Sequence, residues 1–303
     1  MKSTSARDEG NRFIITKDGE EYVFEHKTIK VNDAIAFYTE IGSGEKTILM
    51  LQGFPAPWCI CWEMDTLLSK HFKLIILELP GYLGTKGNPG FIHTHQNFAN
   101  FVYSFINVFG ISPNYVMGES YGGKITLELA RNHPELFEKI VLHSPEYAKP
   151  KIPLALKIIT YSLYPLLKIG FVNKILNPIL IKIFLKFGAQ FVVKGYKLES
   201  MDELTMQMLV DSVKNAELKP LCETMIDVLK PLDQTGLNRI KKETLVISGN
   251  ADESVDIKDS INLAENILLN AKFVGISEFG HWLPVVKPEL TSEIIVNFLN
   301  STP

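Results

Sequence analysis

Residues 115–130 read Tyr-Val-Met-Gly-Glu-Ser-Tyr-Gly-Gly-Lys-Ile-Thr-Leu-Glu-Leu-Ala. A short apolar run, a glycine-rich turn and a helical pattern follow one another in this stretch. The turn contains Gly-x-Ser-x-Gly, with Ser120 between Gly118 and Gly122. Between a strand and a helix, this motif forces the serine backbone into a strained conformation, and side chains at the two glycines would clash. We therefore expect a sharp turn that lifts the Ser120 hydroxyl above a sheet, at the positive end of the next helix.

Chain order distinguishes a nucleophilic serine from an ordinary serine in a glycine-rich turn. An apolar run at 244–248 leads to Asp252, and a later run at 272–276 leads to His281. Both residues lie in loops just past the carboxyl end of an expected strand, where open α/β sheets build their sites. The order serine, acid, histidine is typical of triads whose serine lies on such a turn. We therefore predict Ser120 as the nucleophile, Asp252 as the acid and His281 as the general base.

Other acids and histidines receive different interpretations. Glu146 follows an earlier strand and is the alternative acid of the triad. Asp256 lies where a helix is expected to begin, so we interpret it as a helix cap. His93 and His95 form a His-x-His pair near another helix start, but no third ligand completes a metal site. We expect both histidines to be surface loop residues.

Three further segments match a known pattern. The segment 49–55 reads Leu-Met-Leu-Gln-Gly-Phe-Pro, 78–84 reads Glu-Leu-Pro-Gly-Tyr-Leu-Gly, and 129–136 closes the helix behind the serine. Together with the motifs above, they resemble the α/β-hydrolase fold family, specifically its cap-bearing serine hydrolases of the esterase and lipase type. The resemblance covers 22–147 and 230–303.

The resemblance also implies an oxyanion hole. Its two donors are the backbone N–H groups of Phe54 and Tyr121. Gln52 and Gly53 form the supporting loop, and Gln52 stands where the family usually has histidine. Likewise, Glu78 stands where the family usually has aspartate. Neither departure removes a catalytic group, and we expect Gln52 to fix the loop through a side-chain hydrogen bond.

Strand and helix patterns alternate along most of the chain, which predicts an α/β fold. A β-hairpin over 22–38 opens the sheet. Further strands are expected at 47–51, 73–78, 115–119, 138–143, 243–248 and 272–276, and helices at 62–70, 96–109, 121–132, 255–268 and 287–299. We expect a mainly parallel eight-stranded sheet with helices on both faces and a helical cap inserted after the sixth strand. The expected units are a disordered tail (1–11), an α/β-hydrolase core (12–147 and 230–303) and the cap (148–229).

The cap region has an unusual composition. Residues 148–198 contain nine lysines and no Asp, Glu or Arg, and isoleucine, leucine and phenylalanine dominate. We expect Pro178 in the first turn of a helix capped by Asn177, with apolar residues up to Phe187 covering most of its circumference. Three interpretations stay open: a buried helix packed on the core, a lid that lines an apolar pocket, and reversible contact with a lipid surface.

Composition narrows the classes of protein. Of the 303 residues, 46% are hydrophobic and 21% are charged, as in an ordinary globular protein. A net charge of −3 provides no field that would attract nucleic acid. Cys59, Cys61 and Cys222 do not suggest a disulfide framework, so we expect reduced, buried thiols. Because residues 1–12 include no apolar segment, we expect no signal peptide and a soluble, cytoplasmic protein.

These observations predict a serine hydrolase that cleaves a carboxylic ester with an apolar acyl or alcohol group, through an acyl-enzyme on Ser120. No metal or organic cofactor is implied. Carbon–carbon bond hydrolysis, N-terminal peptide cleavage and lactone opening are the alternatives within the fold. From a different class, the chain could be a non-catalytic protein that binds an apolar ligand under the cap. The sequence does not indicate an oligomeric state.

Overall fold

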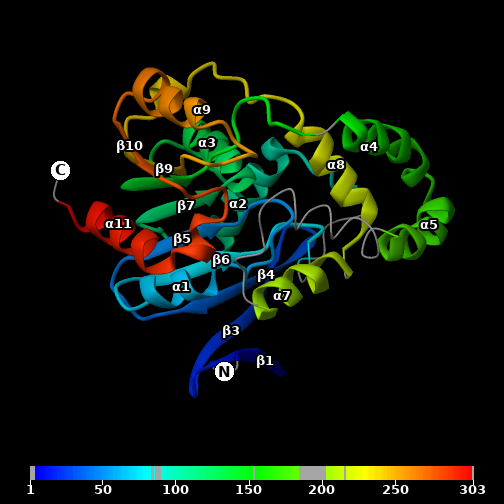
Figure 1. The fold of residues 1–303 in the computed structure, drawn as a ribbon, viewed down its shortest axis with the longest axis horizontal. Coiled ribbons are helices and arrows are strands. Elements are labelled where there is room, and N and C mark those ends of the chain that lie inside the picture. The colour runs from blue at the N-terminus through cyan, green and yellow to red at the C-terminus, as the bar shows by residue number, and fades with distance from the viewer. Residues whose placement is uncertain are drawn as a thin grey trace.

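A twisted sheet forms the centre of the protein, and helices cover both of its faces (Figure 1). The computed structural model describes residues 4–82, 85, 90–152, 154–183, 203–214 and 216–301. Over these residues the sheet has ten strands in the order β1-β2-β3-β4-β6-β5-β7-β8-β9-β10. They are β1 (Thr4–Glu9), β2 (Arg12–Lys17), β3 (Glu20–Val31), β4 (Ala34–Ile41), β5 (Thr47–Leu51), β6 (Lys73–Leu77), β7 (Tyr115–Glu119), β8 (Lys139–His143), β9 (Glu243–Gly249) and β10 (Ala271–Ile276).

The predicted α/β fold is confirmed, with a sheet that is larger than expected. All pairings from β6 through β5, β7, β8 and β9 to β10 are parallel. The pairings from β1 to β4, and of β4 with β6, are antiparallel, which makes the sheet mixed. The eight predicted strands are β3 to β10. The two others, β1 and β2, extend the antiparallel edge.

The N-terminal segment corrects one expectation. β1 pairs antiparallel with β2 along its length, around a turn at Gly10 with a φ angle of 70°. The disordered tail expected over 1–11 is therefore wrong for residues 4–9. The side chains of this strand are mostly polar, so the sequence shows no apolar alternation that would predict it. The strand forms because its backbone N–H and C=O groups pair with those of β2, which would otherwise be an unpaired edge. The side chain of Arg7 also forms an ion pair with Glu21 of β3, at 2.9 Å.

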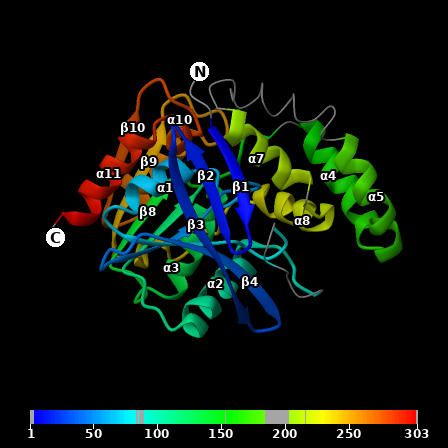
Figure 2. The same cartoon turned by 90° about the horizontal axis from the view of Figure 1, so that it is seen from below.

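Two sets of helices cover the two faces of the sheet (Figures 1 and 2). One face carries α1 (Trp62–Leu68), α10 (Leu283–Val286) and α11 (Pro288–Asn300). The other face carries α2 (His95–Phe109), α3 (Tyr121–Asn132), a 3₁₀ turn (Leu237–Arg239), and α9 (Ile257–Asn262), which continues as a π-helical turn (Leu263–Ile267). All five helices predicted for the core are present.

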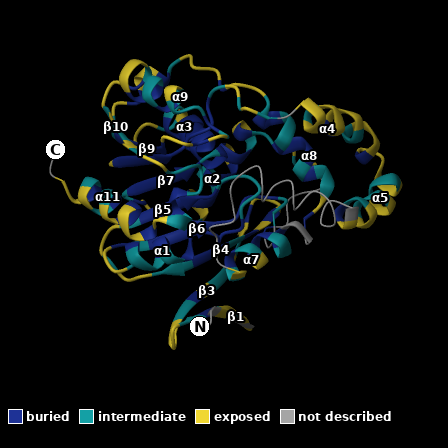
Figure 3. Cartoon of the chain, in the orientation of Figure 1, coloured by how far each residue is buried: buried dark blue, intermediate teal, exposed yellow. Residues whose placement is uncertain are grey.

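The strands separate two apolar cores because successive side chains point to opposite faces. In β5, Leu49 and Leu51 belong to the core under α2 and α3. Ile48 and Met50 belong to the core under α1 and α11. The central strands are buried on both sides (Figure 3), which explains why they read as continuous apolar runs in the sequence.

In the described part of the chain between β8 and β9, four helices stand beside the carboxyl edge of the sheet (Figure 1). They are α4 (Leu154–Leu167), α5 (Gly170–Ile183), α7 (Glu203–Lys214) and α8 (Leu218–Val228). α8 lies against the core, and α4 packs on α8 and on α5. Within the described ranges, no helix is both long and apolar enough to cross a bilayer.

The helix expected to start at Pro178 starts earlier. α5 begins at Gly170 and contains Pro178 in its interior. The side chain of Asn177 caps a different helix, because its Oδ1 accepts a hydrogen bond of 2.6 Å from the backbone N–H of Leu218 in α8. The predicted end of this helix, up to Phe187, lies outside the described residues.

The turn between β7 and α3 has the strained geometry that its motif predicts. Ser120 has φ 49° and ψ −113°, which a non-glycine residue rarely adopts. A Cβ atom at Gly118 would lie 2.3 Å from Oγ1 of Thr126. A Cβ atom at Gly122 would lie 2.1 Å from the carbonyl oxygen of Leu51. Both glycines are therefore required for α3 to pack behind the sheet.

Substituting Gly122 tests this constraint. In Gly122→Ala the new methyl group meets the backbone of β5, which the sheet holds in place, so the free energy of unfolding should fall by about 3 kcal/mol or more. Gly170→Ala in α5 is the matched control, because a Cβ atom there meets nothing within 4 Å. Denaturant unfolding of both variants measures the difference. Equal stability of Gly122→Ala and the parent would contradict the packing described.

Candidate active site

Four loops at one edge of the sheet carry the predicted site residues. Gly53 follows β5, Ser120 follows β7, Asp252 follows β9 and His281 follows β10. These strands run parallel, so their carboxyl ends lie at the same edge. Ligand sites of open α/β sheets are built at this edge.

Asp252 and His281 form a hydrogen-bonded pair. Nδ1 of His281 lies 2.8 Å from Oδ2 of Asp252, and the carboxyl group is buried. Oδ1 accepts backbone N–H bonds from Ser254 and Val255, at 2.8 and 2.9 Å. Burial would raise the pKa of Asp252, but the bond to His281, together with the other donors, lowers it to about 2. The carboxylate is therefore ionised and can only accept, so Nδ1 of His281 carries the proton of this hydrogen bond and Nε2 is the other ring nitrogen.

Backbone hydrogen bonds hold the Ser120 turn against the end of β8. The N–H of Ser120 donates to the carbonyl of His143 at 2.8 Å, and its own carbonyl accepts from Glu146 at 2.9 Å. The ring of His143 lies 6.3 Å from the ring of His281, between centroids. His143 thus connects the serine turn with the His281 loop. Because it is fully buried and next to His281, the pKa of His143 falls to about 3 and its ring is neutral.

The loop after β5 lies directly beside the serine. A Cβ atom at Gly53 would be 3.1 Å from Cβ and 3.8 Å from Oγ of Ser120. The next residue, Phe54, has its ring 6.3 Å from that of Tyr121. Among the described residues, neither the backbone N–H of Phe54 nor that of Tyr121 donates a hydrogen bond. Both groups are available to an oxygen atom bound near Ser120.

Gln52 does not form the hydrogen bond that we expected to fix this loop. Its side chain is only 7% exposed, and its Oε1 has no partner within the described part of the chain. Oε1 is therefore a hydrogen-bond acceptor without a donor among the described residues, and Gln52 lies at a small pocket. The pocket is lined by Gln52, Gly53, Phe54, Ala56, Trp58, Leu77, Glu78, Leu79, Tyr82 and Tyr121. The expected side-chain hydrogen bond is thus absent among the described residues, and a supporting role of Gln52 in this loop stays a prediction.

A buried carboxyl group directly before the serine has no counterpart in the sequence prediction. Burial raises the pKa of Glu119 to about 7, and the thiol of Cys61 lies 3.4 Å from both of its oxygens. Asp65 is fully buried nearby, and burial and Glu119 together raise its pKa well above the usual range. Cys59, Cys61 and Cys222 are all buried, and they form no disulfide among the described residues. Only the position of Glu119 inside the Gly-x-Ser-x-Gly motif could have indicated it.

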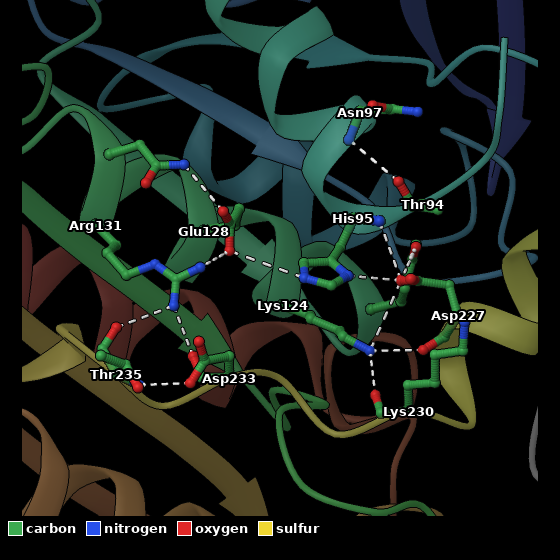
Figure 4. Close-up of polar contacts among 12 residues, drawn as sticks. Thr94, His95, Asn97, Lys124, Glu128, Arg131, Asp227, Lys230, Asp233 and Thr235 are labelled. Atoms are coloured by element: carbon green, nitrogen blue, oxygen red, sulfur yellow. Dashed lines mark hydrogen bonds and ion pairs between the residues drawn. The ribbon is translucent and has the colours of Figure 1, made fainter.

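A second group of buried charges links the serine helix to the cap (Figure 4). Lys124 of α3 is fully buried, and its Nζ donates to the backbone carbonyls of Asp227 and Lys230, at 2.8 and 2.6 Å. The carboxylates of Asp227 and Glu146 lie 3.7 and 3.9 Å from this ammonium group. Glu146, the alternative acid, therefore faces Lys124, whereas Asp252 contacts His281.

The expectation that His93 and His95 are surface loop residues is wrong. Both side chains are buried. His93 lies 2.6 Å from a carboxylate oxygen of Glu223, and His95 lies 2.8 Å from one of Asp227. Their partners in α8 are more than a hundred residues away along the chain, so the local sequence gives no sign of the pairing.

Asp227 is the centre of this group. Its Oδ2 accepts a hydrogen bond of 2.8 Å from the hydroxyl of Tyr121, the first residue of α3. The same oxygen accepts the ring and backbone N–H bonds of His95, at 2.8 and 3.0 Å. The carboxylate of one cap helix thus fixes the start of α3 and the start of α2. The backbone of Tyr121, at the predicted oxyanion hole, is held indirectly by the cap.

Replacing Asp227 should destabilise the protein. In Asp227→Ala, Lys124 loses its closest carboxylate and the hydroxyl of Tyr121 loses its acceptor, so the free energy of unfolding should fall by about 3–5 kcal/mol. Asp233→Ala is the matched control, because this exposed carboxylate accepts a hydrogen bond from Thr235, two residues along the chain, and lies outside the buried group. Denaturant unfolding should leave the control close to the parent. Similar losses in both variants would mean that the buried group does not hold α8 on the core.

Comparisons with known proteins agree with this architecture. A family model for the alpha/beta hydrolase fold matches residues 46–167. An uncharacterized hydrolase, YugF, of Bacillus subtilis is 27% identical over 263 residues, which cover 84% of this chain and 90% of that protein. The pimeloyl-[acyl-carrier protein] methyl ester esterase of Wigglesworthia glossinidia brevipalpis is 26% identical over 77% of this chain and 88% of its own length.

A solved structure has a backbone fold similar to that of this chain. The carboxylesterase CesB of Bacillus subtilis superimposes with a TM-score of 0.74, over 92% of this chain and 93% of the esterase. The sequence identity in this comparison is 15%. At that level the likeness concerns the fold alone, and the chemistry has to be argued from the residues of this chain.

Proposed function

We propose that this member of the α/β-hydrolase superfamily is a serine hydrolase that cleaves carboxylic esters through an acyl-enzyme on Ser120. The observation that carries the proposal is the 2.8 Å bond between His281 and an ionised Asp252, at the same sheet edge as the strained serine turn. The similarity to a methyl ester esterase supports ester hydrolysis over the other reactions of this fold.

Acylation begins with a proton transfer. Nε2 of His281 removes the proton from the Ser120 hydroxyl, and Oγ attacks the carbonyl carbon of the ester. The imidazolium that forms is stabilised by the carboxylate of Asp252, which remains ionised because its pKa is about 2. Asp252 also fixes the tautomer of the imidazole ring, since only a ring protonated on Nδ1 can donate to it.

The negative charge that develops on the carbonyl oxygen needs donors that are already in place. The backbone N–H groups of Phe54 and Tyr121 supply them. When the tetrahedral intermediate collapses, His281 gives its proton to the leaving alcohol. A water molecule then attacks the acyl-enzyme, with His281 again as the base, and the carboxylic acid is released.

The surroundings of the serine favour an apolar substrate. Phe54, Trp58, Leu79 and Tyr82 line the pocket next to the loop after β5. Each buried methylene of an acyl chain would contribute about 0.8 kcal/mol there. Gln52 adds a buried acceptor that has no partner among the described residues, and Glu78 also lines this pocket. We therefore propose esters with an apolar acyl or alcohol group that carries a hydrogen-bond donor.

Three substitutions test the mechanism. With a soluble p-nitrophenyl ester, Ser120→Ala and His281→Ala should lose several orders of magnitude in kcat, and Asp252→Asn about 10⁴-fold, because its amide favours the wrong tautomer. Labelling by a fluorophosphonate should occur in the parent and fail in Ser120→Ala.

Two acids serve as controls for the role of Asp252. Asp256→Asn should retain the parent's activity, because this half-buried residue caps α9 and pairs with Lys151, away from His281. Glu146→Gln should also retain measurable activity, since Glu146 faces Lys124. An active Asp252→Asn together with an inactive Glu146→Gln would overturn the assignment.

Gln52 should determine substrate preference. The parent should hydrolyse a hydroxyalkyl ester with a lower KM than the alkyl ester of the same length, because the substrate hydroxyl satisfies the buried Oε1. One hydrogen bond of this kind corresponds to a preference of about two- to tenfold. Gln52→Leu should lose the preference while keeping kcat on the alkyl ester. If Gln52→Leu lowers kcat equally on both esters, Gln52 supports the loop after all.

A further inference from the structure

Exposed apolar side chains concentrate on two cap helices. Of the fifteen large hydrophobic residues exposed in the described part of the chain, ten lie between residues 154 and 179. Leu154 and Phe171 are the most exposed, at 71% and 72%. Figure 3 shows these exposed surfaces on α4 and α5, at the end of the cap that is farthest from β10 and α11. Scattered exposed hydrophobics are ordinary, but a contiguous group marks an interaction site.

The inner side of α4 is already occupied. Thr160 and Leu167 are buried, and the hydroxyl of Tyr164 lies 3.3 Å from Glu223 of α8. These three residues recur at helical spacing and define the face that packs on α8. Ile158 lies on the opposite face and is exposed, and Ile169, in the turn after α4, is exposed as well. A helix that is apolar on both faces needs a second apolar environment.

α5 adds an ordered stripe to this outer face. Phe171, Ile175 and Ile179 follow one another four residues apart, so they lie on the same side of the helix, and all three are exposed. Lys174 and Lys182 are exposed next to them. The charged residues between 154 and 183 are four lysines, without an acid.

We propose that the outer face of α4 and α5 docks on an anionic lipid surface. Its apolar side chains enter the boundary between headgroups and acyl chains, and its lysines contact lipid phosphates. A second copy of the same face would bring lysines against lysines, whereas anionic headgroups complement them. Docking requires no catalysis, so this proposal stands or falls independently of the proposed reaction.

Sedimentation with vesicles tests the proposal on the full chain. Ser120→Ala and the parent should both bind vesicles of phosphatidylcholine mixed with phosphatidylglycerol at low salt. High salt, or vesicles of phosphatidylcholine alone, should reduce the binding strongly. Lys174→Gln combined with Lys182→Gln should lower the partition coefficient roughly 30-fold, at about 1 kcal/mol for each lysine. Equal binding to neutral and anionic vesicles would overturn the proposal.

Single apolar substitutions distinguish docking through this face from nonspecific hydrophobic binding to vesicles. Phe171→Ser should reduce partitioning at least about tenfold, because one buried aromatic side chain is lost from the lipid. Leu269→Ser is the matched control, since Leu269 is 70% exposed outside the cap and should not matter. Both variants should keep the parent's turnover of a soluble acetyl ester and its far-ultraviolet circular dichroism. Equal effects of the two substitutions on binding would overturn the proposal.

A self-association outcome is also distinguishable. Sedimentation velocity should show the same species for the parent and for Phe171→Ser. If the parent is a dimer that Phe171→Ser converts to a monomer, and neither binds anionic vesicles, the face is an interface between copies and the proposal is wrong.

Discussion

Leu51 ends β5 with its carbonyl oxygen directed at Gly122, so closely that a methyl group there would lie 2.1 Å away. This contact allows α3 to begin immediately behind the sheet, with Ser120 held at a positive φ angle at its start. It also brings the loop after β5 against the serine, where a Cβ atom at Gly53 would be 3.1 Å from Cβ of Ser120. The position of the hydroxyl, and of the two backbone N–H groups near it, follows from this packing.

Buried charge connects the same helix to the cap. Lys124 and Tyr121 lie on one side of α3, and Asp227 of α8 accepts a hydrogen bond from Tyr121 and lies beside the Lys124 ammonium group. Removing ions from water is costly unless they are paired, so these contacts permit few other placements of α8. α4 and α5 pack on α8, where Tyr164 donates to Glu223 and Asn177 accepts from the backbone of Leu218, and they leave their outer faces exposed. Of the described helices between β8 and β9, α8 is thus fixed to the serine helix, whereas α4 and α5 have one side directed toward solvent.

The sequence predicted well those features that depend on near neighbours along the chain. The eight predicted strands and the five core helices are present, because each has its own apolar run or helical period. The strained turn was likewise predictable, because Gly-x-Ser-x-Gly between a strand and a helix is typical of such a turn. β1 was missed because it pairs through its backbone, and a polar strand carries no alternation of side chains.

For the site, the sequence by itself determined which residues could serve, namely Ser120, Asp252 and His281, from their types, order and positions after strands. Only the tertiary structure decided that Asp252, and not Glu146, contacts His281, because both acids follow strands and differ in what packs beside them. It also decided that His95 is buried on Asp227 and that Oε1 of Gln52 has no partner. Hydrogen bonds between segments far apart in the chain depend on distances that the folded backbone sets, and no local pattern of residues encodes them.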